Sequence, residues 1–276
     1  MTRRHLLSTA SATLALAASA TGQNKGRLKQ SVARWCYKQI SLDDLCRAGA
    51  EMGLAAIDLV GPEDAPMLKK YGLVPAMIMP GGGTIPDGLN RLENHASIED
   101  ELRRRIPLAA AAGAPNIITF SGYRRGQSDA QGIENCAIGL NRVKRIAEDH
   151  GVTICVELLN SKVDHHDYQC DHTAWGVELI KRVDSPRVKL LYDIYHMQIM
   201  EGDILRTIRE NIQYIAHFHT GGVPGRHELD DTQELNWRTV AKAIADLGFT
   251  GYVAHEFVPL RDPLTSLRQA VELCTV

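Results

Sequence analysis

The sequence predicts a single (β/α)8 barrel, the TIM-barrel architecture. Eight short apolar segments alternate with amphipathic stretches, as they do when parallel strands are joined by crossover helices. The length of 276 residues suits one such barrel of ~250 residues, and no Pro- or Ser-rich linker divides residues 30–276. An open, doubly wound sheet is the alternative, but no glycine-rich phosphate-binding motif follows the first apolar segment.

The eight apolar segments are predicted to be strands because they are short and rich in Val, Ile, Leu and aromatic residues. Their low charge indicates burial on both faces, as in a parallel sheet covered by helices. In chain order they are SVARWCY (31–37), LAAIDLV (54–60), LVPAMIM (73–79), APNIITFSG (114–122), VTICVELL (152–159), RVKLLYDI (187–194), YIAHFHT (214–220) and GYVAHEF (251–257).

Helices are predicted between these strands where apolar residues recur at intervals of three and four. The clearest repeat spans residues 133–147, and Gly151 can end that helix. The helix before the fourth strand contains Pro107, which should kink it. Asp203 and Asn236 precede two further apolar repeats and are the expected starts of those helices.

The first 26 residues differ from the rest and predict an export signal. Arg3 and Arg4 precede a mildly apolar stretch over residues 6–18, and Ala18-Ser19-Ala20 forms a small-residue cleavage pattern. Paired arginines before a weak apolar core are typical of the twin-arginine type, so we expect a periplasmic or secreted protein. The alternative is a disordered, Ala-rich tail on a cytoplasmic protein. In both cases, residues 27–276 form the predicted catalytic barrel.

The composition excludes several classes of partner. A net charge of −2 and a pI near 6.6 provide no basic field for nucleic acid. No apolar run after residue 26 is long enough to span a membrane. The six cysteines are scattered without a CxxC pair, so no essential disulfide is predicted. The oligomeric state stays open, with a homo-oligomer as one alternative.

Four residues that bind metal ions well stand at the ends of the last four predicted strands. They are Glu157, Asp193, His219 and Glu256, separated by 36, 26 and 37 residues, about one strand–helix–strand unit each. Parallel strands joined by right-handed crossovers end at the same face of a barrel, so these side chains can converge. Three buried carboxylates and an imidazole would repel one another unless a divalent cation lay between them. The spacing therefore predicts one metal site.

Other polar residues near these positions have competing interpretations. Strand alternation places His217 one layer below His219 as a satisfied core histidine, and turns His255 toward the helices. Arg226, on the glycine-rich loop after His219, is either a clamp for a substrate carboxylate or hydroxyl or a solvated arginine. A polar cluster after the fifth strand lacks the spacing of a zinc motif and is predicted to be a flexible lid: Asp164, His165, His166, Asp167, Asp171 and His172.

These motifs resemble the xylose isomerase-like TIM-barrel superfamily, and within it most closely the hydroxypyruvate isomerases. The resemblance covers about residues 30–270, and its most specific pieces are VELLN, YDIYHMQ, HFHTGGVPGRHE and GYVAHEF. It implies that the four residues above hold one divalent ion, usually Mn²⁺ or Mg²⁺. It also implies that His196 and Arg226 contact oxygen atoms of a small sugar or keto-acid substrate.

The chain departs from this pattern at one metal position. Hydroxypyruvate isomerases typically carry Gln where His219 stands, and His is instead the pattern of ketose 3-epimerases in the same superfamily. A sister branch, the apurinic endonucleases, gathers three zinc ions with extra histidines from earlier strands. Here the third and fourth predicted strands end in Met79-Pro80 and Ser121-Gly122, without histidine. We therefore expect a one-metal site and no nucleic-acid partner.

The resemblance implies isomerisation or epimerisation through an enediolate. Glu157 and Glu256 are the expected catalytic pair, in which one removes a proton and the other, or the same one, returns it. Two alternatives remain. A lyase or dehydratase acting on a keto sugar could use the same groups, and a carbohydrate-binding barrel could lack catalysis altogether.

Overall fold

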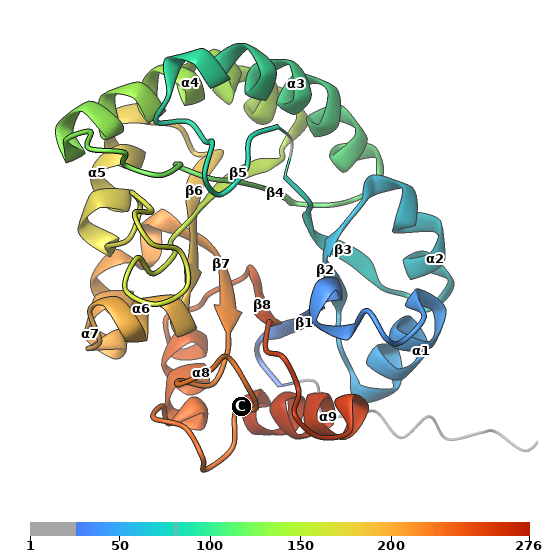
Figure 1. Cartoon of the computed structure of the whole chain (residues 1–276). Coiled ribbons are helices and arrows are strands. Elements are labelled where there is room, and N and C mark those ends of the chain that lie inside the picture. Colours follow the sequence, from blue (N-terminus) through green and yellow to red (C-terminus); the bar gives the residue numbers. More distant parts are fainter. Residues whose placement is uncertain (1–25, 81) are drawn as a thin grey trace, which may run out of the picture.

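The computed structural model describes residues 26–80 and 82–276, and it confirms the predicted barrel (Figure 1). Its parallel strands pair in chain order, and β8 closes the sheet against β1. The predicted export signal lies outside the described residues. The strands are β1 (Lys29–Ala33), β2 (Ala56–Val60), β3 (Val74–Ile78), β4 (Asn116–Thr119), β5 (Thr153–Glu157), β6 (Val188–Asp193), β7 (Ile215–Thr220) and β8 (Tyr252–His255).

The α-helices form a ring outside the strands (Figure 1). They bury one face against the sheet, which explains why strands such as β2, β4 and β5 are buried along their whole length. The helices are α1 (Leu42–Met52), α2 (Ala65–Lys70), α3 (His95–Ala111), α4 (Asp129–His150), α5 (Thr173–Val183), α6 (Ile194–Met200), α7 (Ile204–Asn211), α8 (Trp237–Asp246) and α9 (Pro263–Cys274).

The predicted helix signals are mostly confirmed. α4 ends at Gly151, whose left-handed backbone (φ 69°) is the conformation that favours glycine after a helix. Asn236 caps α8, because its side chain accepts a hydrogen bond from the third residue of the helix. Asp203 precedes α7 but makes no side-chain cap, and α3 continues through Pro107 to Ala111.

Six of the predicted strands end before their apolar runs do, and in two of them a helix begins at the next residue. β1 stops at Ala33, and the rest of its run, Arg34–Tyr37, forms a 3-10 helix (η1) at the barrel rim. β6 stops at Asp193, and α6 begins at the next residue. The Asp193 side chain accepts a hydrogen bond from the backbone N–H of His196, 3.3 Å away, and so caps this helix. Both changes place polar or aromatic groups at the carboxyl end of the barrel.

The expectations about cysteines and membrane spans agree with the structure. All six cysteines are free, and all are buried. Among the helices of the described residues, none has the length and apolar character needed to cross a membrane.

Mild reduction should leave the stability of the protein unchanged, because no disulfide links the six thiols. The midpoint of thermal unfolding, followed by circular dichroism, is expected to be the same with and without dithiothreitol. A thiol reagent should modify all six cysteines in denaturant without prior reduction. A lower midpoint under reducing conditions would contradict this expectation.

Candidate metal and substrate site

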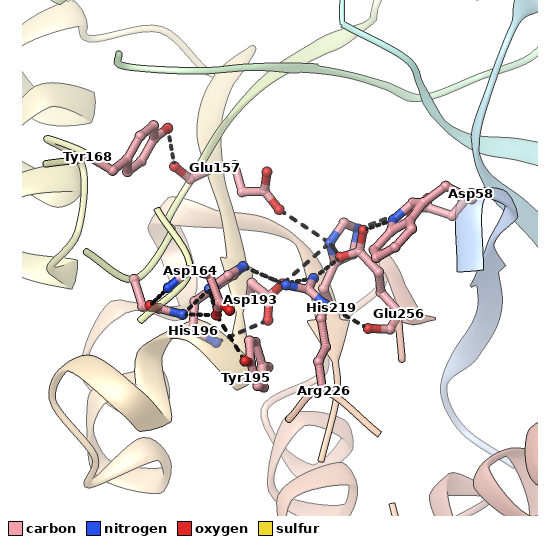
Figure 2. Close-up of polar contacts among 12 residues, drawn as sticks. Asp58, Glu157, Asp164, Tyr168, Asp193, Tyr195, His196, His219, Arg226 and Glu256 are labelled. Carbon is pink, nitrogen blue, oxygen red and sulfur yellow. Dashed lines mark hydrogen bonds and ion pairs between the residues drawn. The ribbon is translucent and has the colours of Figure 1, made fainter. Parts of the chain in front are cut away.

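The four predicted metal ligands meet at the carboxyl end of β5 to β8 (Figure 2). Glu157 and Asp193 are the last residues of β5 and β6, His219 lies in β7, and Glu256 directly follows β8. Asp193 pairs with His219 in the register of β6 and β7, so these two stand at the same level of the barrel. One ligand atom from each of the four residues lies within 4.8 Å of the others, and all four side chains are buried. The structure therefore brings the predicted ligands together.

Arg226 inserts its guanidinium into this cluster rather than into solvent (Figure 2). Its Nη2 donates to Asp193 Oδ2 at 2.6 Å and also contacts the Glu256 carboxylate, and its side chain is only 14% exposed. The guanidinium carbon lies 5.9 Å from the ring centre of Trp35 and 4.9 Å from that of Tyr195, a cation–π arrangement. The interpretation of Arg226 as a solvated arginine is therefore wrong.

The carboxylates of the cluster differ in their affinity for protons. Burial raises the pKa of Glu157 to about 7, although a contact with His219 opposes the shift. Burial also raises the pKa of Asp193, against the attraction of Arg226. For Glu256 burial acts in the same direction, but Arg226 and His219 outweigh it and hold the pKa well below its usual range. Glu256 is thus ionised at neutral pH, whereas Glu157 is poised between its two states.

The pKa values of the two site histidines, His196 and His219, are shifted in opposite directions. Burial opposes the charged form of His219, yet Glu256 and other carboxylates raise its pKa well above the ordinary value. Burial and the charge of Arg226 lower the pKa of His196, which is therefore neutral. Asn160 Nδ2 lies 2.6 Å from His196 Nδ1, and Arg226 Nη1 lies 2.6 Å from His196 Nε2. Because a neutral imidazole accepts at only one nitrogen, only one of these contacts is a hydrogen bond.

A cavity of about 370 Å³ opens beside the cluster and has two unlike walls. Glu157, Asp164, His165, His196, Arg226 and Glu256 form a polar wall at the ends of the later strands. Most of the apolar lining comes from the earlier strands and their loops, namely Leu59, Met79, Pro80, Ile85, Ile118 and Phe120, and Leu159 after β5 adds to it. Trp35 on η1 also lines the cavity, and its indole N–H donates to Glu256.

The loop after β5, which the sequence predicts to be a flexible lid, is bonded to the barrel and to Arg124. The Tyr168 hydroxyl donates to the backbone carbonyl of Glu157 (2.9 Å) and accepts from the backbone N–H of Ser121 (3.0 Å). Asp171 is paired with Arg124 at 3.0 Å. Within the described residues, this loop contributes no member to either buried group of histidines and carboxylates. Asp164 and His165 of this loop line the cavity.

Sequence reasoning missed Asp58, which lies in β2 beside His219 (Figure 2). Asp58 Oδ2 is 2.8 Å from His219 Nε2, and Oδ1 is 3.2 Å from His217 Nε2. Burial opposes the charge of Asp58, but the two imidazoles lower its pKa. The one available signal was a carboxylate in the middle of a fully buried strand.

Two further predictions concern the neighbouring histidines. His217 is buried below His219 as expected, but neither of its ring nitrogens makes a hydrogen bond of acceptable geometry, so it is not a satisfied core histidine. His255 is structural as predicted. Its Nε2 is 2.8 Å from Gln30 Oε1, and Gln30 in turn donates to the carbonyl of Val271 in α9.

The sequence profile of the family described as "Xylose isomerase-like TIM barrel" matches residues 48–274. The chain therefore belongs to this family, as the motifs at the ends of β5 to β8 predicted.

Two relatives of the chain indicate the class of enzyme within this family. The 2-oxo-tetronate isomerase of Cupriavidus necator is 27% identical over 238 residues, which are 81% of this chain and 89% of that protein. A zebrafish protein named "Putative hydroxypyruvate isomerase" is 29% identical over 171 residues, which are 58% of this chain and 62% of that protein. Both names support the predicted enzyme class, an isomerase.

A crystal structure titled AP endonuclease, family 2, from Brucella melitensis superimposes with a TM-score of 0.74 at 25% identity. The superposition covers 87% of this chain and 97% of that one.

Removal of the Arg226 charge should destabilise the protein in a pH-dependent way. In Arg226→Gln, Asp193 and Glu256 lose their buried partner, a change that costs about 3–5 kcal/mol when a buried ion pair is broken. The loss should be largest at pH 8 and smaller at pH 5, because the pKa of Glu256 rises once the guanidinium is gone and protonation then relieves the repulsion. Urea unfolding in the presence of EDTA measures both values.

Arg182→Gln is a matched control for this variant. Arg182 lies on α5 and pairs with Glu134 at an exposed position, so its removal should change the free energy of unfolding by less than about 1 kcal/mol. An equal effect of the two substitutions would show that Arg226 is not the counter-charge of the cluster.

Proposed function

We propose that the protein is a metal-dependent isomerase that acts on a small sugar or keto acid. The observation that carries the proposal is the convergence of Glu157, Asp193, His219 and Glu256 within 4.8 Å, beside a cavity that also contains His196 and Arg226. The names of the isomerase relatives support the reaction class.

The chemistry of the four side chains fits a divalent cation. Three carboxylates and one imidazole form an oxygen-rich set, which suits Mn²⁺ or Mg²⁺ better than softer metals. His219 Nδ1 is buried and makes no hydrogen bond of acceptable geometry, so its lone pair can serve a cation. When bound there, the cation would polarise neighbouring carbonyl and hydroxyl oxygens as a Lewis acid and so favour an enediolate.

The protein's own groups would move and hold the proton. With the cation bound, Glu157 and Glu256 would both be ionised at neutral pH, so that either could accept a proton from the substrate carbon and return it. Glu256 stays ionised and is the second base of the proposed pair. Neutral His196 and cationic Arg226 would orient substrate oxygens from the polar wall of the cavity.

The outcome of the proton transfer defines the competing functions. His219 matches the residue that is the pattern of ketose 3-epimerases at this position. Epimerisation at a carbon next to a ketone is therefore the second candidate. An isomerase and an epimerase both conserve the mass of the substrate, a dehydratase releases water, and a binding protein exchanges no substrate hydrogen with solvent. Mass spectrometry and proton NMR in D₂O, on a panel of hydroxypyruvate, ketohexoses and 3-keto sugars, separate all four.

A nuclease function is not favoured, although one superimposed structure carries an endonuclease title. The cavity wall built by Leu59, Ile118 and Phe120 is apolar, and the net charge of the chain is −2. A phosphate backbone requires a track of Lys and Arg, which this wall does not provide. Export by the twin-arginine route and assembly into a homo-oligomer stay predictions of the sequence.

Replacement of either glutamate should abolish most of the turnover. Glu157→Gln and Glu256→Gln are each expected to lower kcat by ~10²–10⁴, because an amide cannot exchange the proton. The assay is the rate of product formation on the substrate that the panel identifies, with Mn²⁺ at saturation. Glu234→Gln, an exposed carboxylate on the loop after β7, is the control and should retain full activity. Full turnover in Glu256→Gln would refute its assigned role.

The affinity for Mn²⁺ should rise with pH between 5 and 8. In the metal-free protein Glu157 has a pKa of about 7 and the pKa of His219 is also raised, so a cation must displace protons from both. For each proton that binding releases, the affinity for Mn²⁺ rises about tenfold per pH unit, as long as the pH is below the pKa of the group that carried the proton. Isothermal titration calorimetry in two buffers of different ionisation enthalpy measures the affinity and the number of protons released. Affinity that is constant over this range would contradict the expectation.

A further inference from the structure

His219 presents its two ring nitrogens to two different groups of residues. Nδ1 faces the predicted ligands, with Glu157 Oε1 at 3.5 Å, Asp193 Oδ2 at 3.8 Å and the Glu256 carboxylate in close contact. Nε2 faces the other way and lies 2.8 Å from Asp58 Oδ2 (Figure 2). A neutral imidazole carries one hydrogen and one lone pair, so the group at Nε2 decides what Nδ1 can offer.

The backbone of β2 is irregular at Asp58 and the residue that follows it. The pairing of β2 with β3 shifts between Ile57 and Asp58 and again between Asp58 and Val60. Leu59 has a φ of 52°, a left-handed conformation that side chains of this size rarely adopt. In a regular strand, neighbours face opposite sides. Here Asp58 reaches His219 in the barrel interior while Leu59 lines the cavity, so the irregularity re-aims adjacent side chains.

A second imidazole lies beside Asp58. Its other oxygen, Oδ1, lies 3.2 Å from His217 Nε2, and the rings of His217 and His219 stand edge to face with centres 5.1 Å apart. All three side chains are fully buried. The carboxylate therefore lies between two layers of β7, with one oxygen near each imidazole.

By composition alone, Asp58, His217 and His219 could also be a second metal site. The ring chemistry of His219 disfavours this. If its lone pair at Nδ1 serves the upper cluster, Nε2 carries a hydrogen and cannot bind another ion. The lower group then retains two protein ligands, fewer than the three or four that closed protein sites use. A hydrogen bond from Nε2 to Asp58 satisfies both atoms.

We infer that Asp58 is a positioning residue that accepts the Nε2 hydrogen of His219 and so turns the Nδ1 lone pair toward the metal ligands. This inference rests on the proposed metal site. A carboxylate behind a ligating histidine fixes the ring orientation and raises the basicity of the ligand, and its loss weakens metal binding by ~10–100-fold. Asp58 contacts neither the cavity nor the proposed proton-transfer atoms, so it acts through His219.

Mn²⁺ binding to graded variants tests this role. Asp58→Asn keeps an acceptor of the same shape without the charge, and Asp58→Ala removes the acceptor. Calorimetric titration should show ~10-fold weaker Mn²⁺ binding for the Asn variant and ~100-fold weaker binding for the Ala variant. Circular dichroism and unfolding midpoints identify folded variants. Asp171→Asn, which removes a different buried carboxylate paired with Arg124, should bind Mn²⁺ like the wild type.

Each other outcome has a distinct meaning. Unchanged affinity in both folded variants would overturn the inference, and equal weakening in both would show that Asp58 supplies charge rather than an acceptor. Two Mn²⁺ ions per wild-type chain would make Asp58 a ligand. If the wild type binds no Mn²⁺, the proposed function fails instead.

A measurement on the wild type covers the case in which the variants do not fold. A long-range ¹H–¹⁵N spectrum of the Zn²⁺-loaded wild type should show His219 with hydrogen on Nε2 and the metal on Nδ1. The opposite assignment would overturn the inference without any variant.

Discussion

Three carboxylates are buried within 4.8 Å of one imidazole at the carboxyl end of the barrel. The surrounding residues offset the electrostatic repulsion among these carboxylates. Two like charges about 4 Å apart repel by about 4 kcal/mol at the effective dielectric of ~20 that suits protein sites. Glu157, Asp193 and Glu256 form three such pairs, so their repulsion is of the order of the stability of a whole domain. Positive charge must therefore enter the cluster.

The fold supplies that charge from one side and excludes water from the other. The loop after β7 carries Arg226 between the carboxylates, and the rings of Trp35 and Tyr195 flank its guanidinium. The early strands contribute an apolar wall, which lowers the local dielectric and strengthens every interaction in the cluster. The polar wall of the cavity thus lies at β5 to β8, which carry the candidate ligands, and the apolar wall lies mainly at the earlier strands. β2 is the exception, since it supports the ligands through Asp58.

The sequence could predict the fold and the convergence of the four candidate ligands because both leave regular patterns. Apolar runs at βα spacing mark the strands, and a polar residue at the end of a run marks the carboxyl face, where Glu157, Asp193, His219 and Glu256 lie. Asp58 left no such pattern. Its contact with His219 joins residues 161 positions apart, and its direction depends on a backbone irregularity in β2 that no local periodicity records. Trp35 could be named as a residue that enters the site from an early loop, but its place was not fixed, since an apolar run looks the same in a strand and in the 3-10 helix η1.

Charge balance links the proton affinities of the site to the valence of the proposed ion. Counted without Asp58, the four candidate ligands and Arg226 carry a net charge of −2 when Glu157, Asp193 and Glu256 are ionised and His219 is neutral, and a divalent cation would offset this charge. Without a cation, a proton on Glu157 and a second proton on His219 give the same balance, and their raised pKa values favour this state. Two protons and one divalent cation are therefore alternative occupants of equal charge. The exchange of two protons for one divalent cation therefore leaves the net charge of the buried cluster unchanged, whatever charge Asp58 adds to it.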